Sequence, residues 1–194
     1  MYIGRFLVVG PGIGAYRVSS RSFPNRKIIE EGNACQVRPT TGADTTDNPF
    51  VSYTCSREVG DALAFGNGSH VDPIADKLEL GYPPRDALAM GLLTMDFERD
   101  EYDTPRIGAI LHDGAHIGVV RRDGITVREV TEPHLVATYE RNEPTPYEVD
   151  WSSAAEAARE AYRLDFEHPV CALGIIRSGE AFETAIHNGT EEKA

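Results

Sequence analysis

Short apolar runs separated by glycine-containing turns fill the first third of the chain and predict β-strands. The runs over residues 2–9 and 15–20 flank a Pro-Gly-Ile-Gly turn, which is typical of a β-hairpin. The polar segment over residues 40–49 is expected to be a loop. Further strands are predicted over residues 34–38, 50–56 and 58–65.

The middle of the chain changes to a helical period. Asp72 can cap a helix that has Pro73 at its first position, extends to about Leu80 and stops at Gly81. A second helix is predicted over residues 84–99, because its apolar residues recur on one face.

The final third returns to strands, with one further helix. Asp-Gly pairs at 113–114 and 123–124 separate apolar runs, which is a strong hairpin signal. Ser153 and Glu156 form a capping-box pattern that begins a helix ending near Leu164. Residues 188–194 are expected to be frayed. Strands are predicted over residues 107–112, 117–121, 125–130, 135–140, 170–177 and 182–186.

This order of elements indicates an α+β protein. Strict alternation of strands and helices, which builds a parallel sheet, is not seen. The pattern favours antiparallel sheets stacked face to face with helices on the outside. At 194 residues, with no internal repeat and no long linker, the chain is interpreted as a single domain over residues 1–194.

An excess of acidic residues limits the classes of partner. The chain has 31 Asp and Glu against 19 Lys and Arg, a formal net charge of −12. Such a surface repels nucleic-acid phosphates, so nucleic acid is not an expected partner. Lysine is scarce, occurring at Lys27, Lys77 and Lys193. This balance favours a salt-rich cytosol, where screening weakens self-repulsion, although an ordinary acidic protein has a similar composition.

The cysteines and the apolar runs indicate a cytoplasmic protein. Cys35, Cys55 and Cys171 are far apart and lack metal-ligand spacing, so free thiols are expected. The N-terminal run is interrupted by Arg5 and does not fit a signal peptide. No stretch approaches the roughly 18 apolar residues that cross a bilayer, so no membrane partner is expected.

A cluster of arginines and serines over residues 19–26 is the first candidate for binding chemistry. Arg21 and Arg26 can bind phosphate oxygens through their planar forks, and Ser19, Ser20 and Ser22 add hydroxyl donors. A phosphate pocket is one interpretation. A strand end followed by a surface loop with ordinary salt bridges fits the same residues equally well.

The glycine-rich segment over residues 66–70 is a weaker candidate. It leads from a strand to a helix N-terminus, where backbone amides favour anions, but a plain turn has the same pattern. His70 and Asp72 suggest a metal site only weakly, because no further ligands are apparent. No metal and no cofactor are therefore expected.

Two further features carry chemistry that the sequence leaves ambiguous. The segment 95–106 places five acids after an apolar helix, where negative charge opposes the helix dipole. Such a cost is accepted at some functional sites, but an acidic surface explains most of these carboxylates. Tyr53 alternates with strand neighbours, and a tyrosine in such a pattern is usually a core or rim residue.

Five segments together resemble the archaeal-type IMP cyclohydrolase family. They are, in order, MYIGRFLVVG, AYRVSSRSFPNR, NPFVSYTC, GNGSHVDPIADKLELG and MDFERDEYDTPRI. The resemblance covers the first two-thirds of the chain and becomes looser towards its end. The second and fourth segments are long and specific.

The resemblance implies a four-layered αββα sandwich of the N-terminal-nucleophile-hydrolase type. The chain starts with Met1 and Tyr2, so the usual Ser, Thr or Cys nucleophile of that fold is expected to be absent. The implied reaction belongs to the cyclic-amidine hydrolases and completes de novo purine biosynthesis. It converts 5-formamidoimidazole-4-carboxamide ribonucleotide, a purine ribonucleotide precursor, to IMP and water. A homo-oligomer such as a tetramer is also implied.

The resemblance and the chemistry together suggest roles for ten residues. The expected catalytic residues are Tyr53, as proton donor or orienter of the formyl oxygen, and Glu98, for the amide proton, with Glu101 as the alternative carboxylate. The expected substrate-binding residues are Arg21 and Arg26 at the 5′-phosphate, Asn67, Gly68 and Ser69 beside the ribose or base, and Thr104 and Arg106 at the pocket edge.

Two other functions fit parts of the same pattern. An amide-cleaving hydrolase on this fold would need a new N-terminal nucleophile exposed by cleavage. A non-catalytic module that binds purine mononucleotides would keep the arginine and serine cluster but would need neither Tyr53 nor a carboxylate near the base.

The composition predicts that salt stabilises the protein. Urea unfolding should be followed by circular dichroism between about 0.1 M and about 1 M KCl, where the Debye length falls from about 10 Å to about 3 Å. The unfolding midpoint should rise with salt, because self-repulsion among the acidic residues is screened. Full stability in dilute buffer with no response to KCl would contradict this prediction.

Overall fold

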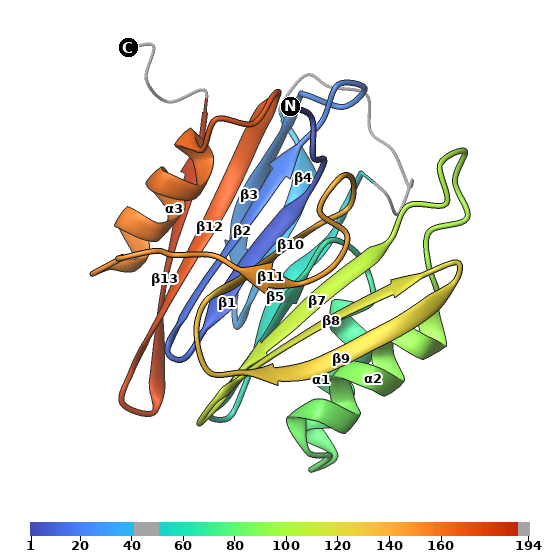
Figure 1. Cartoon of the computed structure of the whole chain (residues 1–194). Helices are drawn as coiled ribbons and strands as arrows, with labels where there is room; N and C mark the ends of the chain where they lie inside the picture. Colours follow the sequence, from blue (N-terminus) through green and yellow to red (C-terminus); the bar gives the residue numbers. More distant parts are fainter. Residues whose placement is uncertain (41–50, 190–194) are drawn as a thin grey trace.

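The computed structural model describes residues 1–40 and 51–189, whose strands form two antiparallel sheets (Figure 1). The six-stranded sheet has the order β11-β10-β1-β2-β12-β13, and the seven-stranded sheet runs from β3 to β9 in chain order. The first sheet contains β1 (Phe6–Gly10), β2 (Ile13–Ser19), β10 (His134–Ala137), β11 (Thr145–Pro146), β12 (Pro169–Ser178) and β13 (Ala181–Asn188). The second contains β3 (Arg26–Glu31), β4 (Ala34–Pro39), β5 (Tyr53–Val59), β6 (Ala62–Gly66), β7 (Arg106–Leu111), β8 (Ala115–Arg121) and β9 (Gly124–Val130).

The inner faces of the two sheets pack on each other and form the main core. Leu7, Tyr16 and Leu173 of the first sheet share one buried cluster with Phe65 and Ile117 of the second. Helices cover the outer faces (Figure 1). Because central strands are covered on both faces, β1 and β7 are buried at every position. The structure is therefore α+β, and the arrangement is compatible with the expected sandwich.

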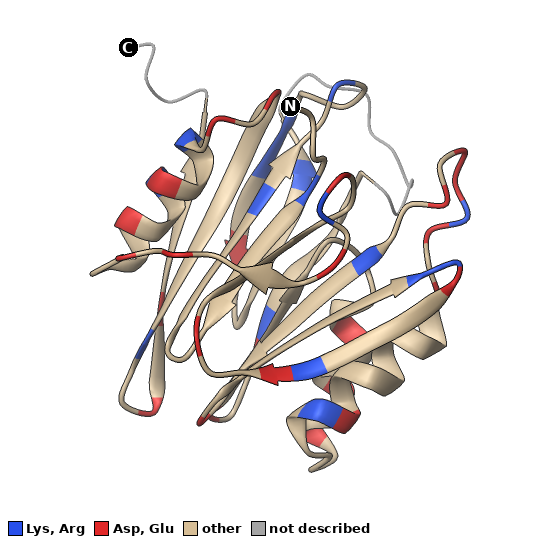
Figure 2. Ribbon diagram, viewed as in Figure 1, with Lys and Arg blue, Asp and Glu red and all other residues tan. Residues whose placement is uncertain are grey.

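The three helices of the described residues are divided between the two outer faces. Helices α1 (Val71–Glu79) and α2 (Pro84–Met95) pack against the seven-stranded sheet, and α3 (Ala154–Arg163) packs against the six-stranded sheet. Figure 2 shows acidic residues on all three of these helices and in many loops. Within the described residues, no helix is long and apolar enough to cross a membrane.

Helix α3 approaches its sheet closely because both surfaces carry small residues. Its buried residues are all alanine, and they lie over Gly174 of β12. A Cβ atom added at Gly174 would lie 2.1 Å from the carbonyl oxygen of Ala154. The helix backbone therefore occupies the space that any side chain at Gly174 would need.

An asparagine joins the two sheets at one edge. The side chain of Asn188, the last residue of β13, accepts a hydrogen bond of 2.9 Å from the amide of Ile28 in β3 and donates one of 3.0 Å to its carbonyl. The prediction of a frayed tail from residue 188 is therefore wrong at Asn188, because this pairing orders it. The rest of that tail from residue 190 lies outside the described residues.

Local turn and cap signals are confirmed by the structure. Both Asp-Gly pairs lie in hairpins, joining β7 to β8 and β8 to β9. The Pro-Gly-Ile-Gly turn joins β1 to β2. Ser153 caps α3, because its hydroxyl accepts a 3.2 Å hydrogen bond from the amide of Glu156.

Several predicted boundaries are wrong, each for a local reason. The run over residues 58–65 is not one strand, because Gly60 adopts a φ of 58° and a hairpin separates β5 from β6. The helix predicted to residue 99 ends at Met95, because Asp96 adopts a φ of 56°. Helix α1 begins at Val71, after His70, so Asp72 lies within its first turn instead of capping it.

Two strands were missed and three were misplaced. Edge strand β3 has only two apolar residues between charged ones, and β11 has only two residues, so neither carries a clear period. Strand β1 begins at Phe6 instead of residue 2, and β10 ends at Ala137 instead of residue 140. Strand β5 begins at Tyr53, not at residue 50. Residues 41–49 of the predicted loop and the predicted strand residue 50 lie outside the described residues.

The close approach of α3 predicts a large effect of one methyl group. Gly174→Ala should lower the free energy of unfolding by about 1–3 kcal/mol or more, because overpacking against the helix backbone forces a shift. Gly124→Ala is the matched control, since a Cβ atom there meets nothing within 4 Å. Urea unfolding measures both variants. Equal stability of the two would contradict the described packing.

Candidate active site

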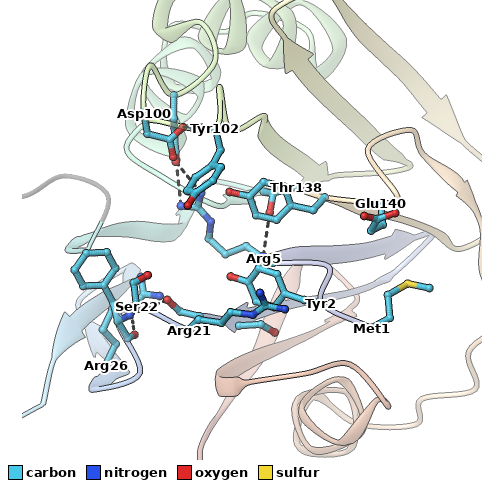
Figure 3. Close-up of a pocket in the computed structure, with 16 residues that line it drawn as sticks. Met1, Tyr2, Arg5, Arg21, Ser22, Arg26, Asp100, Tyr102, Thr138 and Glu140 are labelled. Carbon is cyan, nitrogen blue, oxygen red and sulfur yellow. Dashed lines mark hydrogen bonds and ion pairs between the residues drawn. The ribbon is translucent and has the colours of Figure 1, made fainter.

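A cavity of about 550 Å³ opens at one end of the two sheets (Figure 3). Its walls come from residues 1–5 before β1, residues 19–26 from the end of β2 to the start of β3, residues 98–102 between α2 and β7, and residues 138–140 after β10. Asp100 and Tyr102 lie on one side of the cavity, Ser22 and Arg26 lie on the opposite side, and Arg5 reaches between them (Figure 3). Both sheets therefore contribute to the cavity.

A buried ion pair lies at the cavity. The two terminal nitrogens of Arg5 donate to the two carboxylate oxygens of Glu98 at 3.1 and 2.7 Å. The side chains are only 11% and 1% exposed, so this bidentate pair is well shielded from water. Burial alone would lower the pKa of Arg5, but the Glu98 carboxylate outweighs it and raises that pKa above its ordinary value. Arg5 therefore stays charged.

A second arginine approaches the same carboxylate. Arg106 lies 3.6 Å from Oε1 of Glu98, and burial lowers the pKa of Arg106 although Glu98 opposes that shift. Two guanidinium groups thus face one carboxylate. The ion-pair cluster of Arg5, Glu98 and Arg106 carries a net positive charge, which favours a ligand with anionic or carbonyl oxygens.

Two buried tyrosines form a phenol pair behind the cavity wall. The hydroxyls of Tyr16 and Tyr53 are 2.7 Å apart. Burial raises the pKa of both phenols, while the positive charges of Arg26 and Arg5 partly oppose the shift at Tyr53. Both phenols therefore stay protonated at neutral pH. Because one hydroxyl accepts from the other, a second proton is free for a further acceptor.

The segment of residues 19–26 presents hydroxyl donors to the cavity. Ser19 Oγ accepts a 3.1 Å hydrogen bond from Nε of Arg17, and Ser20 Oγ accepts one of 3.0 Å from the amide of Phe23. Each hydroxyl proton is thereby left for a ligand. Nε of Arg26 donates to the carbonyl of Phe23 at 2.9 Å, which fixes that guanidinium beside the serines. This wall suits phosphate oxygens.

The opposite wall is aromatic and is braced by hydrogen bonds. The Thr104 hydroxyl bonds to Asp100 at 2.7 Å and to the Tyr139 hydroxyl at 2.8 Å. The Tyr139 ring stacks on Tyr2 with 5.8 Å between ring centroids, and Tyr102 meets it edge-on at 6.4 Å. Flat rings of this kind are suitable partners for a planar heterocycle.

The structure brings most of the predicted residues together, but at different depths. Arg21, Arg26 and Glu98 line the cavity. Five others lie directly behind it and contact or influence its charged residues: Tyr53, Asn67, Gly68, Thr104 and Arg106. Glu101 is exposed on the loop after α2, and Ser69 is half-buried; neither lines the cavity.

Asn67 has a clear structural task. Its side chain donates to the carbonyl of Pro105 at 2.9 Å and accepts from the amide of Ile107 at 2.8 Å, while its own carbonyl accepts from Arg5 at 3.1 Å. It therefore holds the start of β7 and the guanidinium of Arg5 in fixed positions. Ligand contact by its amide would require these bonds to be replaced.

Sequence reasoning missed Arg5 and the tyrosines of the aromatic wall. Arg5 carried a signal, since an arginine within an apolar run that becomes a buried strand must find an anionic or polar partner. The sequence contained no signal for Tyr2 and Tyr139, because their contact joins segments over a hundred residues apart.

A neutral histidine supports the site from behind. His70 is fully buried, and its Nε2 lies 2.8 Å from the carbonyl of Ile107. Burial, together with the positive charges of Arg106 and Arg5, lowers the pKa of His70 to about 3, although the bond to Ile107 opposes this shift. A neutral imidazole here avoids adding a third positive charge beside the two arginines.

Comparisons with known proteins agree on one family. Residues 2–181 match the family described as IMP cyclohydrolase-like protein. The chain is 55% identical over 190 residues to the IMP cyclohydrolase of Natronomonas pharaonis, covering 97% of this chain and 100% of that protein. Identity to the IMP cyclohydrolase of Halobacterium salinarum is 57% over 192 residues, covering 97% and 99%. That of Methanocella arvoryzae is 43% identical over 201 residues, covering 98% and 100%.

The buried imidazole predicts a loss of stability in mild acid. Below pH 6.5 the unfolded chain protonates His70, whereas the folded protein does so only near pH 3, so stability falls as the pH decreases through this window. The contribution is about 1.4 kcal/mol per pH unit.

Unfolding of the His70→Gln variant measures this contribution. Glutamine can still donate to Ile107 but does not titrate, so the slope of unfolding free energy against pH should be shallower than in the wild type between pH 6.5 and about 4.5. Identical slopes in the wild type and the variant would show that His70 does not titrate as described.

Proposed function

The chain belongs to the IMP cyclohydrolase-like protein family, and we propose that it converts 5-formamidoimidazole-4-carboxamide ribonucleotide to IMP and water. One observation of the structure carries this proposal beyond the family. A single cavity combines a wall of arginines and serines, an aromatic wall and a buried arginine–carboxylate pair backed by two phenols. These are the parts that a mononucleotide with two reacting arms requires.

The reaction is intramolecular, so geometry is the first requirement. The carboxamide nitrogen bonds to the formyl carbon and loses one proton, which the formyl oxygen gains. The formamido nitrogen then loses its proton as the C–O bond breaks, so that a C=N bond forms in the new ring and the oxygen leaves as water. Holding the two arms in a near-attack arrangement lowers the barrier without a covalent enzyme intermediate. The arginines and serines of residues 19–26 hold the phosphate end in this proposal, and the aromatic wall of Tyr2, Tyr102 and Tyr139 borders the heterocycle.

The phenol pair and the ion-pair cluster are placed to move protons and stabilise charge. Tyr53 is proposed to donate a proton to the formyl oxygen or to orient that oxygen. The hydrogen bond between its hydroxyl and that of Tyr16 supports this role. Arg5 stabilises the negative charge that develops on that oxygen. Both oxygens of Glu98 already accept from Arg5, so Glu98 must exchange one of these bonds to take the amide proton, and otherwise it acts by positioning Arg5.

Finer features of the family are proposed on the same basis. The enzyme is proposed to be a cyclic-amidine hydrolase of purine biosynthesis that acts in the cytoplasm as a homo-oligomer. Its two packed sheets and outer helices are compatible with the sandwich of the N-terminal-nucleophile hydrolases. Asn67, Gly68, Thr104 and Arg106 are proposed to support the site from behind the cavity wall, whereas the roles of Glu101 as the alternative carboxylate and of Ser69 as a ligand contact stay predictions, since neither residue lines the cavity.

A direct assay tests the proposal. Purified protein is mixed with the formamido nucleotide in salt-containing buffer without added metal, and the conversion to IMP is followed by ultraviolet absorbance and by chromatography. Catalytic accumulation of IMP is expected. Tight binding of the nucleotide with no conversion would instead support a non-catalytic binding module and would overturn the proposal.

Two substitutions test the proposed catalytic residues. Tyr53→Phe and Glu98→Gln should lower kcat by about 100-fold or more, since positioned proton transfer contributes about 10²–10⁴-fold. The affinity for IMP should change far less, because the residues of the phosphate wall remain. Steady-state kinetics and calorimetry measure the two quantities.

Tyr147→Phe is the matched control, because Tyr147 packs in the cluster beneath α3 and does not line the cavity. Thermal unfolding of each variant separates lost chemistry from lost folding. Normal turnover in both Tyr53→Phe and Glu98→Gln would remove these residues from the catalytic step.

A further inference from the structure

Arg17 is a buried arginine with no carboxylate partner among the described residues. It lies in β2 and is fully buried, although the chain has 31 acidic residues from which a partner could come. Among residues 1–40 and 51–189, no carboxylate lies within ion-pair distance of its guanidinium. Leaving a charge in the interior without a counter-ion is costly, so such an arrangement calls for an explanation.

Neutral groups satisfy the guanidinium of Arg17. One terminal nitrogen donates to the carbonyls of Ala161 and Leu164 at 3.2 and 2.8 Å, and the other donates to the carbonyl of Phe166. These carbonyls lie at and just beyond the C-terminal end of α3, where the helix dipole favours a cation. They stabilise the charge without cancelling it, so a positive potential remains around the guanidinium.

The third nitrogen of Arg17, Nε, faces a residue of the cavity wall. This nitrogen donates at 3.1 Å to Oγ of Ser19, which is 3% exposed and lines the cavity beside Ser20 and Arg21. A hydroxyl that accepts from a guanidinium is polarised and must direct its own proton elsewhere. Capping of α3 needs only the carbonyl contacts, so this fourth bond is not explained by helix capping.

We propose that Arg17 is a positioning residue of the phosphate subsite, where it aims the Ser19 hydroxyl at a phosphate oxygen and supplies an unneutralised positive charge from behind the wall. The inference rests on the proposed function, because it places the phosphate of the nucleotide at residues 19–26. Arg17 would add a positive charge to the phosphate subsite without contacting the ligand. The phosphate itself would then be the counter-ion that Arg17 lacks within the described residues.

The test compares ligands that differ in the phosphate alone. Calorimetry gives the dissociation constants of IMP, inosine and ribose 5-phosphate for the wild type and for Arg17→Gln, Arg17→Lys and Ser19→Ala. The preference for IMP over inosine should fall about tenfold in Arg17→Gln and in Ser19→Ala. It should be partly restored in Arg17→Lys, which keeps the charge but not the full set of bonds. In Arg17→Gln and Ser19→Ala, the KM for the formamido nucleotide should rise while kcat stays nearly unchanged.

Arg177→Lys is the matched control. Arg177 is also a largely buried arginine of the same sheet that donates to a backbone carbonyl, that of His112, but it does not line or contact the cavity. Its substitution should leave the preference for IMP at the wild-type value. Thermal unfolding is recorded for every variant, and Ser19→Ala keeps the carbonyl contacts of Arg17 should Arg17→Gln fail to fold.

The outcomes separate this inference from the proposed function. A purely structural role for Arg17 predicts a lower Tm with equal losses of IMP and inosine affinity, and an unchanged preference in Ser19→Ala; that result overturns the inference. Normal IMP formation with this result would leave the proposed function intact. Conversely, binding of ribose 5-phosphate that depends on Arg17, in a protein that never forms IMP, would support the inference and overturn the proposed function. Failure of the wild type to bind either phosphate ligand would overturn both.

Discussion

The ion pair between Arg5 and Glu98 is the contact on which the candidate site depends. Arg5 directly precedes the six-stranded sheet, whereas Glu98 belongs to the connection that enters the seven-stranded sheet. The pair therefore joins the two sheets where the cavity opens. Burying two charges costs desolvation energy, and an apolar contact of similar volume would give equal or greater stability. What an apolar contact would not provide is a guanidinium held at a defined place in the cavity wall.

Much of the fold follows from short-range signals in the sequence. Asp-Gly pairs and the cap at Ser153 act within a few residues, so the hairpins of β7 to β9 and the start of α3 could be predicted. Where tertiary contacts decide, the sequence was insufficient. Edge strand β3 is formed by pairing with β4, not by its own apolar pattern, and the end of α2 at Met95 depends on the unusual backbone of Asp96.

The site was partly predictable for the same reason. Arg21 and Arg26 are close in sequence, so their joint position on one wall could be anticipated. Glu98 was distinguished from the neighbouring acids by the resemblance to a family, and the structure shows the physical difference: it is 1% exposed, whereas Glu101 lies on the surface. The carboxylate that faces Arg5 and the ring that stacks on Tyr2 depend on contacts between distant segments, which no local pattern encodes.

Because four separate segments from both sheets build the cavity, the site exists only once the whole chain has folded. Arg5 and Glu98 are 93 positions apart, and such distant pairings form late and slowly during folding. A partly folded intermediate with one finished sheet would hold no nucleotide. A molecule that occupies the cavity therefore binds only the native protein, and its binding stabilises both sheets together by mass action. Occupancy of the cavity thus reports on the integrity of the entire chain, including strands far from the reacting groups.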